Sequence, residues 1–245
     1  MYENLKKKFG QNFLIDKNIL KKITDLIPRN NLSIIEIGPG DGSLTEKIIE
    51  KKPKKLVIIE KDIDLINILN KKFSKYKYVN ILNSDFLKID INDNYNLIIS
   101  NLPYNISSQV IAKISILKNP PILLILMFQK EFAKRLTDKK LNSINSLINC
   151  FYKINFQFEV SRNCFRPIPK VDSSVLTFVK IENSLLEDNE IEKFIEFKRY
   201  LFSHKRKSLK NLLKKFNMGT EFNLNLRVED LELKELISMF RRINS

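Results

Sequence analysis

The sequence predicts an α/β protein with an open, doubly wound parallel sheet and a small C-terminal helical domain. Short apolar stretches alternate with amphipathic ones through residues 33–138. The apolar stretches contain few polar residues, which is typical of strands covered by helices on both faces. Three of the five glycines lie together at residues 38–42, directly after the first of these stretches. In such a sheet, ligands bind at the carboxyl ends of the strands.

The expected elements follow in order along the chain. Strands are predicted at residues 33–37, 55–60, 78–83, 95–100 and 121–128. Helices are predicted between and after them, near residues 44–51, 62–74, 106–118 and 129–138. This strand and helix alternation favours parallel crossover units.

The second half of the chain changes character. Residues 147–160 and 173–181 resemble strands with no long helix between them, which indicates an antiparallel edge. The polar stretch 182–189 is typical of a linker, and residues 190–245 have a helical pattern. We therefore expect one domain over residues 1–182 and a helical domain over residues 183–245.

Composition narrows the classes of function. A net charge of +15 favours a polyanionic partner. The chain has two cysteines, Cys150 and Cys164, and one histidine, His204, so a four-ligand zinc site and a Ser-His-Asp triad are not expected. The low cysteine content and the absence of a signal-like start indicate a cytoplasmic protein. The longest apolar run, residues 121–128, is too short to span a membrane.

The glycine cluster predicts a cofactor turn. Gly38, Gly40 and Gly42 have the spacing G-x-G-x-G, which differs from the G-x-G-x-x-G of a dinucleotide site. Glycine allows the backbone to approach a ligand closely and to adopt positive φ. Glu36 at the preceding strand end would repel a phosphate but suits a cation. S-adenosylmethionine, with its sulfonium and α-amino groups, matches this pattern without a metal.

Polar side chains follow the next strands as well. Glu60 ends the second strand, about twenty residues after the glycine turn, where an acid commonly accepts hydrogen bonds from ribose hydroxyls. Asp85 follows the third strand and is placed to accept from an adenine amino group. Asn101 follows the fourth. Each alone is compatible with a solvated loop residue, but their common position predicts one site.

The segment Asn101-Leu102-Pro103-Tyr104 indicates transfer to an amino nitrogen. The exocyclic nitrogen of adenine is a poor nucleophile because its lone pair is delocalised into the ring. An amide oxygen and a carbonyl in a turn stiffened by proline can hold its N–H groups, and tyrosine offers a face on which the base stacks.

With these residues in view, the chain resembles the ribosomal RNA adenine N6,N6-dimethyltransferases that act on the small subunit. The resemblance covers residues 6–181 and rests on four segments: Phe9-Gly10-Gln11-Asn12-Phe13-Leu14, the glycine turn with Ser43-Leu44-Thr45, Asn101-Leu102-Pro103-Tyr104-Asn105-Ile106-Ser107, and Phe165-Arg166-Pro167-Ile168-Pro169-Lys170-Val171-Asp172-Ser173-Ser174. It implies dimethylation of two adjacent adenosines near the 3′ end of small-subunit RNA, with the small ribosomal subunit as partner. The sequence leaves the oligomeric state open, and a monomer is the default expectation. Residues 140–147 depart from the family pattern.

The resemblance also implies roles for single residues. Asn12 and Leu14 would close over the cofactor, in a pocket that is lined by Gly38, Glu60, Asp85 and Asn101. Tyr104 and Phe165 would sandwich the target adenine. Asn101 and the Leu102 carbonyl would hold its amino group. Without the resemblance, Phe165 could equally be a core residue and Asn12 a helix cap.

The basic segment 197–220 near the C-terminus is predicted to form a helix that contacts RNA. Residues 197–220 contain no acid, and Leu209, Leu212, Leu213 and Phe216 have the spacing of one helix face. The cationic residues chosen as phosphate contacts are Lys205, Arg206, Lys207 and Lys210. A solvated lysine-rich helix is the alternative.

Other functions remain open on the sequence alone. The large-subunit adenine methyltransferases of macrolide resistance share much of the pattern, although Gly10, Pro39 and Leu102 favour the small-subunit family. A ribosome assembly or transcription factor with little catalysis is a third possibility. A DNA adenine methyltransferase is disfavoured, because the chain has Asn101 where such enzymes usually have Asp and lacks a target-recognition insert.

Overall fold

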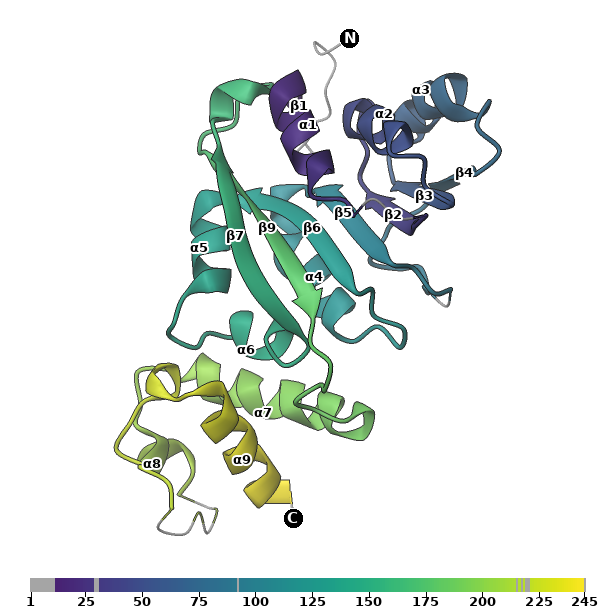
Figure 1. Cartoon of the computed structure of the whole chain (residues 1–245). Coiled ribbons are helices and arrows are strands. Elements are labelled where there is room, and N and C mark those ends of the chain that lie inside the picture. The colour runs from purple at the N-terminus through teal and green to yellow at the C-terminus, as the bar shows by residue number, and fades with distance from the viewer. Residues whose placement is uncertain are drawn as a thin grey trace. The chain divides into compact units, whose positions relative to one another are not determined.

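The computed structural model describes residues 12–28, 31–91, 93–214, 216, 218 and 221–244 (Figure 1). Gly10 and the basic residues Lys6, Lys7 and Lys8 lie outside this part. The chain divides into two compact units. The sheet unit is Met1–Ala133 with Ile154–Lys180, and the helical unit is Lys134–Lys153 with Ile181–Ser245. The chain thus passes into the helical unit near residue 181, close to the expected boundary, but that unit also takes in residues 134–153.

A seven-stranded sheet forms the sheet unit, in the order β4-β3-β2-β5-β6-β9-β7. The five predicted strands are present and parallel, each within two residues of its expected bounds: β2 (Ser33–Ile37), β3 (Lys55–Glu60), β4 (Val79–Asn83), β5 (Leu97–Asn101) and β6 (Leu123–Gln129). β9 (Ser173–Lys180) runs antiparallel to β6, as the sequence predicted, and β7 (Tyr152–Val160) ends the sheet.

Helices cover both faces of this sheet, because successive strand residues point to opposite sides and both sides are apolar. Ile34, Leu56 and Ile99 pack in one cluster with apolar residues of α1 (Lys17–Asp25), α2 (Ser43–Glu50) and α3 (Ile63–Phe73). The alternate residues Ile35 and Ile98 are equally buried but outside that cluster. α4 (Ser107–Ser115) lies behind the sheet in Figure 1.

The start of α1 answers one question left by the sequence. The Asp16 carboxylate accepts hydrogen bonds from the backbone N–H groups of Asn18 at 2.8 Å and Ile19 at 3.0 Å, so Asp16 caps this helix. Asn12 is therefore not the cap of α1.

The prediction of a strand from residue 147 is wrong at its start. Residues Asn145–Ile148 form the short helix α6, and β7 begins only at Tyr152. Asn142 Nδ2 donates to the Arg135 carbonyl at 2.7 Å, and Asn145 Oδ1 accepts from the Asn142 N–H at 2.7 Å. These side chains build the turn that departs from the family pattern. Apolar content alone could not separate a short helix from a strand here.

The helical unit contains α7 (Ile191–Ser203), α8 (Leu209–Leu212) and α9 (Leu233–Asn244), in agreement with the predicted helical character. The rings of Phe194 and Phe240 pack edge to face at 5.3 Å between α7 and α9. α5 (Lys130–Thr137) follows β6 along the chain.

A buried lysine also joins two segments of the helical unit. The Lys198 Nζ of α7 donates to the Ser143 carbonyl at 2.6 Å, and burial lowers the pKa of Lys198 to about 8.

Candidate functional site

One pocket of the sheet unit opens at the carboxyl ends of β2, β3, β4 and β5, where the sequence placed a ligand. The cavity has a volume of about 240 Å³. Many of the residues that line it were singled out from the sequence, namely Asn12, Leu14, Glu36, Gly38, Gly40, Glu60, Asp85, Asn101, Leu102 and Tyr104. The first helix, the glycine turn and the strand ends thus converge on a single cavity.

The glycine turn follows β2 and forms part of this wall. Gly40 has a φ of +63°, and a Cβ there would lie 2.6 Å from the ring of Phe13. Both the left-handed backbone and the contact with Phe13 exclude a side chain. Gly38 also has a positive φ of +62°, and its N–H donates to the Ile59 carbonyl at 2.9 Å. The turn therefore presents bare backbone to the pocket.

Glu36 lies buried beside this turn, with 1% of its surface exposed. Its Oε2 accepts a hydrogen bond from the Thr45 hydroxyl at 2.6 Å, while Oε1 accepts none within the described part of the chain. Burial raises the pKa of Glu36 to about 8, and the nearby carboxylates of Asp41 and Glu60 act in the same direction. A pocket-lining carboxyl with an unsatisfied oxygen is suited to a cationic ligand.

Glu60 is oriented by backbone groups at the end of β3. Its Oε1 accepts from the N–H groups of Lys61 at 2.8 Å and Asp62 at 2.9 Å, and its Oε2 accepts from the Gly40 N–H at 3.3 Å. Burial raises the pKa of Glu60, although these hydrogen bonds oppose the shift. The carboxylate is therefore fixed at the wall of the cavity, beside the glycine turn.

Asp85 lies across the pocket from the turn and has a partner that the sequence analysis missed. The Lys61 ammonium forms an ion pair with Asp85 Oδ2 at 2.8 Å, and Asp85 Oδ1 accepts from the Leu87 N–H at 3.0 Å. The ammonium lowers the pKa of Asp85. If a ligand donates a hydrogen bond to Asp85, the carboxylate would accept from the ligand and from the Lys61 ammonium at the same time.

Asn101 ends β5 and is held by the N-terminal segment. Its Nδ2 donates to the Asn12 carbonyl at 3.1 Å, and none of the hydrogen bonds among described residues uses Oδ1. The Tyr104 hydroxyl, a few residues further on, is hydrogen-bonded to the Ser173 hydroxyl at 2.7 Å. Burial raises the pKa of Tyr104. These two contacts orient the amide and the ring at the mouth of the same cavity.

Phe165 is the residue that the structure does not bring into the pocket. It belongs to the two-residue strand β8 (Phe165–Arg166), which pairs with β1 (Phe13–Leu14), and its backbone lies opposite Leu14. The side chain is fully buried in the hydrophobic core and does not line the cavity. The expected sandwich with Tyr104 is absent from this conformation, because Phe165 presents no exposed face on which a base could stack.

Phe13, Lys61 and Ser173 are the functional candidates that the sequence did not reveal. Phe13 lines the cavity, Lys61 holds Asp85, and Ser173 holds Tyr104. Phe13 and Ser173 lie within quoted motifs, so their position was a signal, but their contacts join distant parts of the chain. No sequence feature distinguished Lys61 from the many other lysines of the chain.

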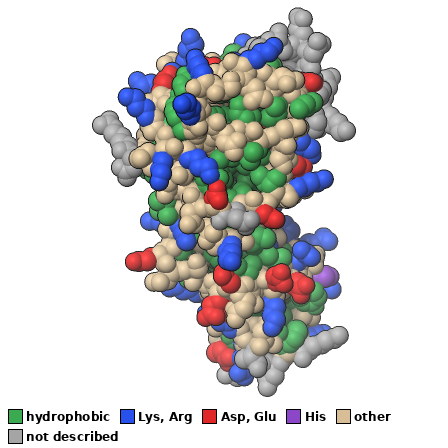
Figure 2. Space-filling view, turned by 90° about the vertical axis from the view of Figure 1, so that its right-hand side faces the viewer, with side chains coloured by type: hydrophobic (Ala, Val, Ile, Leu, Met, Phe, Trp, Pro, Cys, Tyr) green, Lys and Arg blue, Asp and Glu red, His purple; other side chains and the backbone are tan. Residues whose placement is uncertain are grey.

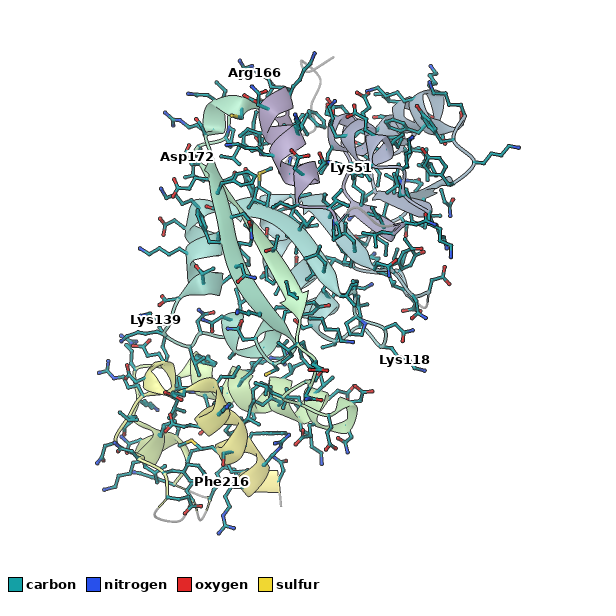
Figure 3. The ribbon with its side chains drawn as sticks, viewed as in Figure 1. Lys51, Lys118, Lys139, Arg166, Asp172 and Phe216 are labelled. Atoms are coloured by element: carbon teal, nitrogen blue, oxygen red, sulfur yellow. The ribbon has the colours of Figure 1, made fainter. Side chains whose placement is uncertain are left out.

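The continuous basic helix predicted near the C-terminus is wrong. Lys205, Arg206 and Lys207 are exposed in a turn after α7, and α8 spans only four residues, among them Lys210. The backbone N–H groups of Leu209 and Lys210 donate to carbonyls at Leu226 and Leu224, which joins α8 to a distant segment. Leu209, Leu212 and Leu213 are buried as expected, whereas Phe216 is 44% exposed (Figure 3).

Basic side chains are also spread over the rest of the surface. On the face in Figure 2, Lys and Arg are scattered among acidic and apolar residues. The net charge alone therefore does not define a contact surface on that face.

The described ranges contain neither a cluster of metal ligands nor a membrane-spanning helix. No group of three His, Cys, Asp or Glu side chains there could hold a metal ion. Likewise, no helix formed by those residues is long and apolar enough to cross a membrane.

The doubly wound sheet with an acidic, glycine-walled pocket at its carboxyl edge defines the class of Rossmann-like methyltransferases. Solved structures of that class are similar in fold. A dimethyladenosine transferase from Plasmodium falciparum superimposes with a TM-score of 0.81 at 24% identity, covering 95% of this chain and 97% of that one. The 23S rRNA methyltransferase ErmE gives a TM-score of 0.75 at 22% identity, covering 95% and 100% of the two chains.

The family follows from the sequence comparisons. The family model described as ribosomal RNA adenine dimethylase matches residues 2–245. A ribosomal RNA small subunit methyltransferase A from Mycoplasmopsis pulmonis is 43% identical over 237 residues, covering 94% of this chain and 89% of the relative. One from Mycoplasma capricolum is 40% identical and covers 97% of both chains. The chain belongs to the ribosomal RNA adenine dimethylase family.

Proposed function

We propose that this chain is an S-adenosylmethionine-dependent enzyme that dimethylates the N6 nitrogens of two adjacent adenosines near the 3′ end of small-subunit ribosomal RNA. The family match supports adenine dimethylation of ribosomal RNA, and the names of relatives at 36–43% identity support the small-subunit substrate over the large-subunit one. The two adjacent targets rest on the family resemblance. The likeness to the 23S enzyme is one of fold alone.

The pocket residues fit the proposed cofactor. The backbone of the glycine turn lines the cavity without side chains at Gly38 and Gly40, and the unsatisfied Glu36 oxygen suits a positive charge. Glu60 would accept from the ribose hydroxyls and Asp85 from the adenine amino group, with Asn12 and Leu14 at the other wall. The bound cofactor would supply a methyl group on a sulfonium, which needs no metal for activation.

The observation that carries the catalytic proposal is the anchoring of Asn101. Because Nδ2 is used by the Asn12 carbonyl, the amide is oriented, and no other described residue takes its Oδ1, which can accept from an adenine N–H. The Leu102 carbonyl would accept the second N–H. Two fixed acceptors favour a pyramidal nitrogen, whose lone pair is then free to attack.

The residues do not need to supply a strong base. The nitrogen lone pair forms the new N–C bond, the S–C electron pair stays with sulfur, and the nitrogen loses its proton after alkylation, when it has become acidic. Asn101 and Leu102 would hold the amine throughout. Tyr104, oriented by Ser173, would present its ring to the base. Phe165 would join it only after a local rearrangement, because it is fully buried here.

Substitution of Asn101 tests this role. We expect Asn101→Ala to abolish methyl transfer while binding of S-adenosylmethionine survives in weakened form. Asn101→Asp keeps acceptor oxygens and is the matched control, so it should retain more activity than the alanine variant. Methyl transfer is measured with labelled cofactor and cofactor binding by calorimetry. Normal turnover by Asn101→Ala would refute the amine-holding role.

The exposed residues Lys205, Arg206, Lys207 and Lys210 are proposed to contact phosphates of the RNA. The turn after α7 places three of them in succession without an acid between them. This local run supports a phosphate contact even though the predicted long helix is absent.

A further inference from the structure

A rigid, exposed loop connects β8 to β9 in the sheet unit. Its residues are Pro167, Ile168, Pro169, Lys170, Val171 and Asp172. Ile168 is 53% exposed and Val171 38% exposed, so the outer surface of the loop is apolar. The two prolines fix φ on both sides of Ile168. Asp172 accepts from the Arg162 N–H through its carboxylate at 2.9 Å and from the Lys130 N–H through its carbonyl at 2.9 Å.

Both ends of this loop are attached to residues that line the pocket. On one side, Arg166 pairs through its backbone with Phe13, whose ring forms part of the cavity wall. On the other side, Ser173 is bonded to the Tyr104 hydroxyl at 2.7 Å. Arg166 and Asp172, labelled in Figure 3, lie at the same end of the sheet unit as α1. The loop is therefore fixed next to the cavity mouth.

The charged side chains around the loop favour the binding of a polyanion. Arg162, Arg166 and Lys170 are exposed. None of them takes part in an ion pair between described residues; their side-chain contacts are to backbone carbonyls, as in the 2.8 Å bond from Arg166 to the Phe165 carbonyl. Asp172 is the one acid of the segment 161–172, and it is half-buried. The rim thus combines cations with a stiff apolar tip.

An isolated exposed isoleucine is common on protein surfaces and needs no explanation by itself. This one lies between two prolines, beside exposed cations and beside a pocket that is proposed to receive a base. A base must leave its stack before it can enter such a pocket, and apolar side chains inserted at a base step fill the gap that it leaves. A β-branched side chain on a rigid loop loses little conformational entropy in this role.

We propose that Ile168 is a wedge that inserts next to the target adenosine and stabilises its extruded state, while Arg166 and Lys170 bind the flanking phosphates. The proposal rests on the proposed function, because it assigns RNA as the partner of the loop. It makes Ile168 a positioning residue that acts on the conformation of the RNA. It assigns no chemical step to the loop.

The test uses an RNA hairpin that contains the two adjacent target adenosines, in which 2-aminopurine replaces one of the two. The other remains as the target. Its fluorescence rises when the stack opens, and the assay needs no methyl transfer. The full-length protein is added to saturation, with binding followed by anisotropy. Ile168→Ala is compared with Ile122→Ala, since Ile122 is similarly exposed at 58% and lies in the same unit. We expect the wild type and Ile122→Ala to raise the fluorescence several-fold and Ile168→Ala to raise it less than half as much.

A second readout separates the wedge from general binding. Single-turnover methyl transfer by Ile168→Ala should fall about tenfold on the hairpin but less than about twofold on a single-stranded RNA, in which little stacking has to be broken. An equal fluorescence rise for Ile168→Ala and the wild type, or an equal loss of rate on both RNAs, would overturn the proposal. Failure of the wild type to methylate any small-subunit RNA would instead contradict the proposed function, and the fluorescence result would be independent of it.

The cations are tested by salt dependence. A plot of log affinity against log salt has a negative slope. Replacing Arg166 and Lys170 with glutamine should make this slope shallower by about 1.4, at about 0.7 per phosphate contact for single strands. Ile168→Ala should leave that slope unchanged. A reduced slope for Ile168→Ala, or an unchanged one for the glutamine variant, would contradict this division of roles.

Discussion

Glu36 makes the binding of a cationic cofactor depend on pH. Burial raises the pKa of this carboxyl to about 8, so near neutral pH the free protein holds it mostly protonated. A cation favours the ionised form. Since the ionised fraction of such a group grows about tenfold per pH unit below its pKa, affinity for S-adenosylmethionine should rise about tenfold between about pH 6 and about pH 7. Binding should release a proton over that range.

Glu36→Gln removes this titration while keeping an acceptor for the Thr45 hydroxyl. The variant should bind S-adenosylmethionine with nearly the same affinity at both pH values and several-fold more weakly than the wild type at the upper one. Calorimetry in two buffers of different ionisation enthalpy measures both the affinity and the released proton. The range ends below the pKa expected for the ligand's own α-amino group, about 7.7–8.0. A flat wild-type profile, or an equal slope in the glutamine variant, would refute the reasoning.

The same shift affects the stability of the free protein. Because the folded-state pKa lies above the usual glutamate value of 4.5, the contribution of Glu36 is fully present below about pH 4.5 and is lost as the pH rises through about 8. The melting temperature of the wild type should therefore fall relative to Glu36→Gln over this interval.

Three further predictions follow from single contacts. Gly40→Ala should destabilise the fold by about 2–5 kcal/mol in urea unfolding, because about 1–2 kcal/mol comes from the left-handed backbone and about 1–3 from displacing the Phe13 ring; a loss below about 0.5 kcal/mol would contradict the crowding. Ser173→Ala and Tyr104→Phe each remove one hydrogen bond, so the double variant should lose no more methyl-transfer rate than either single variant, and additive losses would show independent roles. Neutralising Lys205, Arg206 and Lys207 should lower the salt slope of RNA affinity by about 2 units, whereas an unchanged slope would remove this turn from the interface.

The parallel sheet was predictable because the local signal was strong. The apolar runs of β2, β3, β5 and β6 are buried on both faces, whereas the edge strand β4 is partly exposed. Strand bounds came out within two residues, and strand ends such as Glu60 and Asn101 could be assigned to one edge. Their placement around one cavity follows from the geometry of parallel strands. The contacts that orient them, such as the bond from Asn101 to Asn12, join residues 89 apart and left no periodic signal.

The wrong predictions also concern features that depend on contacts between residues far apart in the sequence. The spacing of Leu209 and Phe216 is helical, but α8 spans only Leu209–Leu212. The N–H groups of its first turn are bonded to the distant Leu224 and Leu226 carbonyls, which the spacing does not reveal. An aromatic residue in a motif does not reveal whether its ring faces a ligand or the core, and Phe165 faces the core. Lys61 became recognisable only once β3 and β4 were placed side by side.

The central claim is tested most directly by supplying the protein with labelled S-adenosylmethionine and, separately, with small subunits that lack the modification and with free large-subunit RNA. The RNA is then digested and the labelled nucleoside identified by mass. The account predicts label in N6,N6-dimethyladenosine from the small subunit and none in the large-subunit RNA. Label on the large-subunit RNA alone, or cofactor binding without transfer to either RNA, would contradict it.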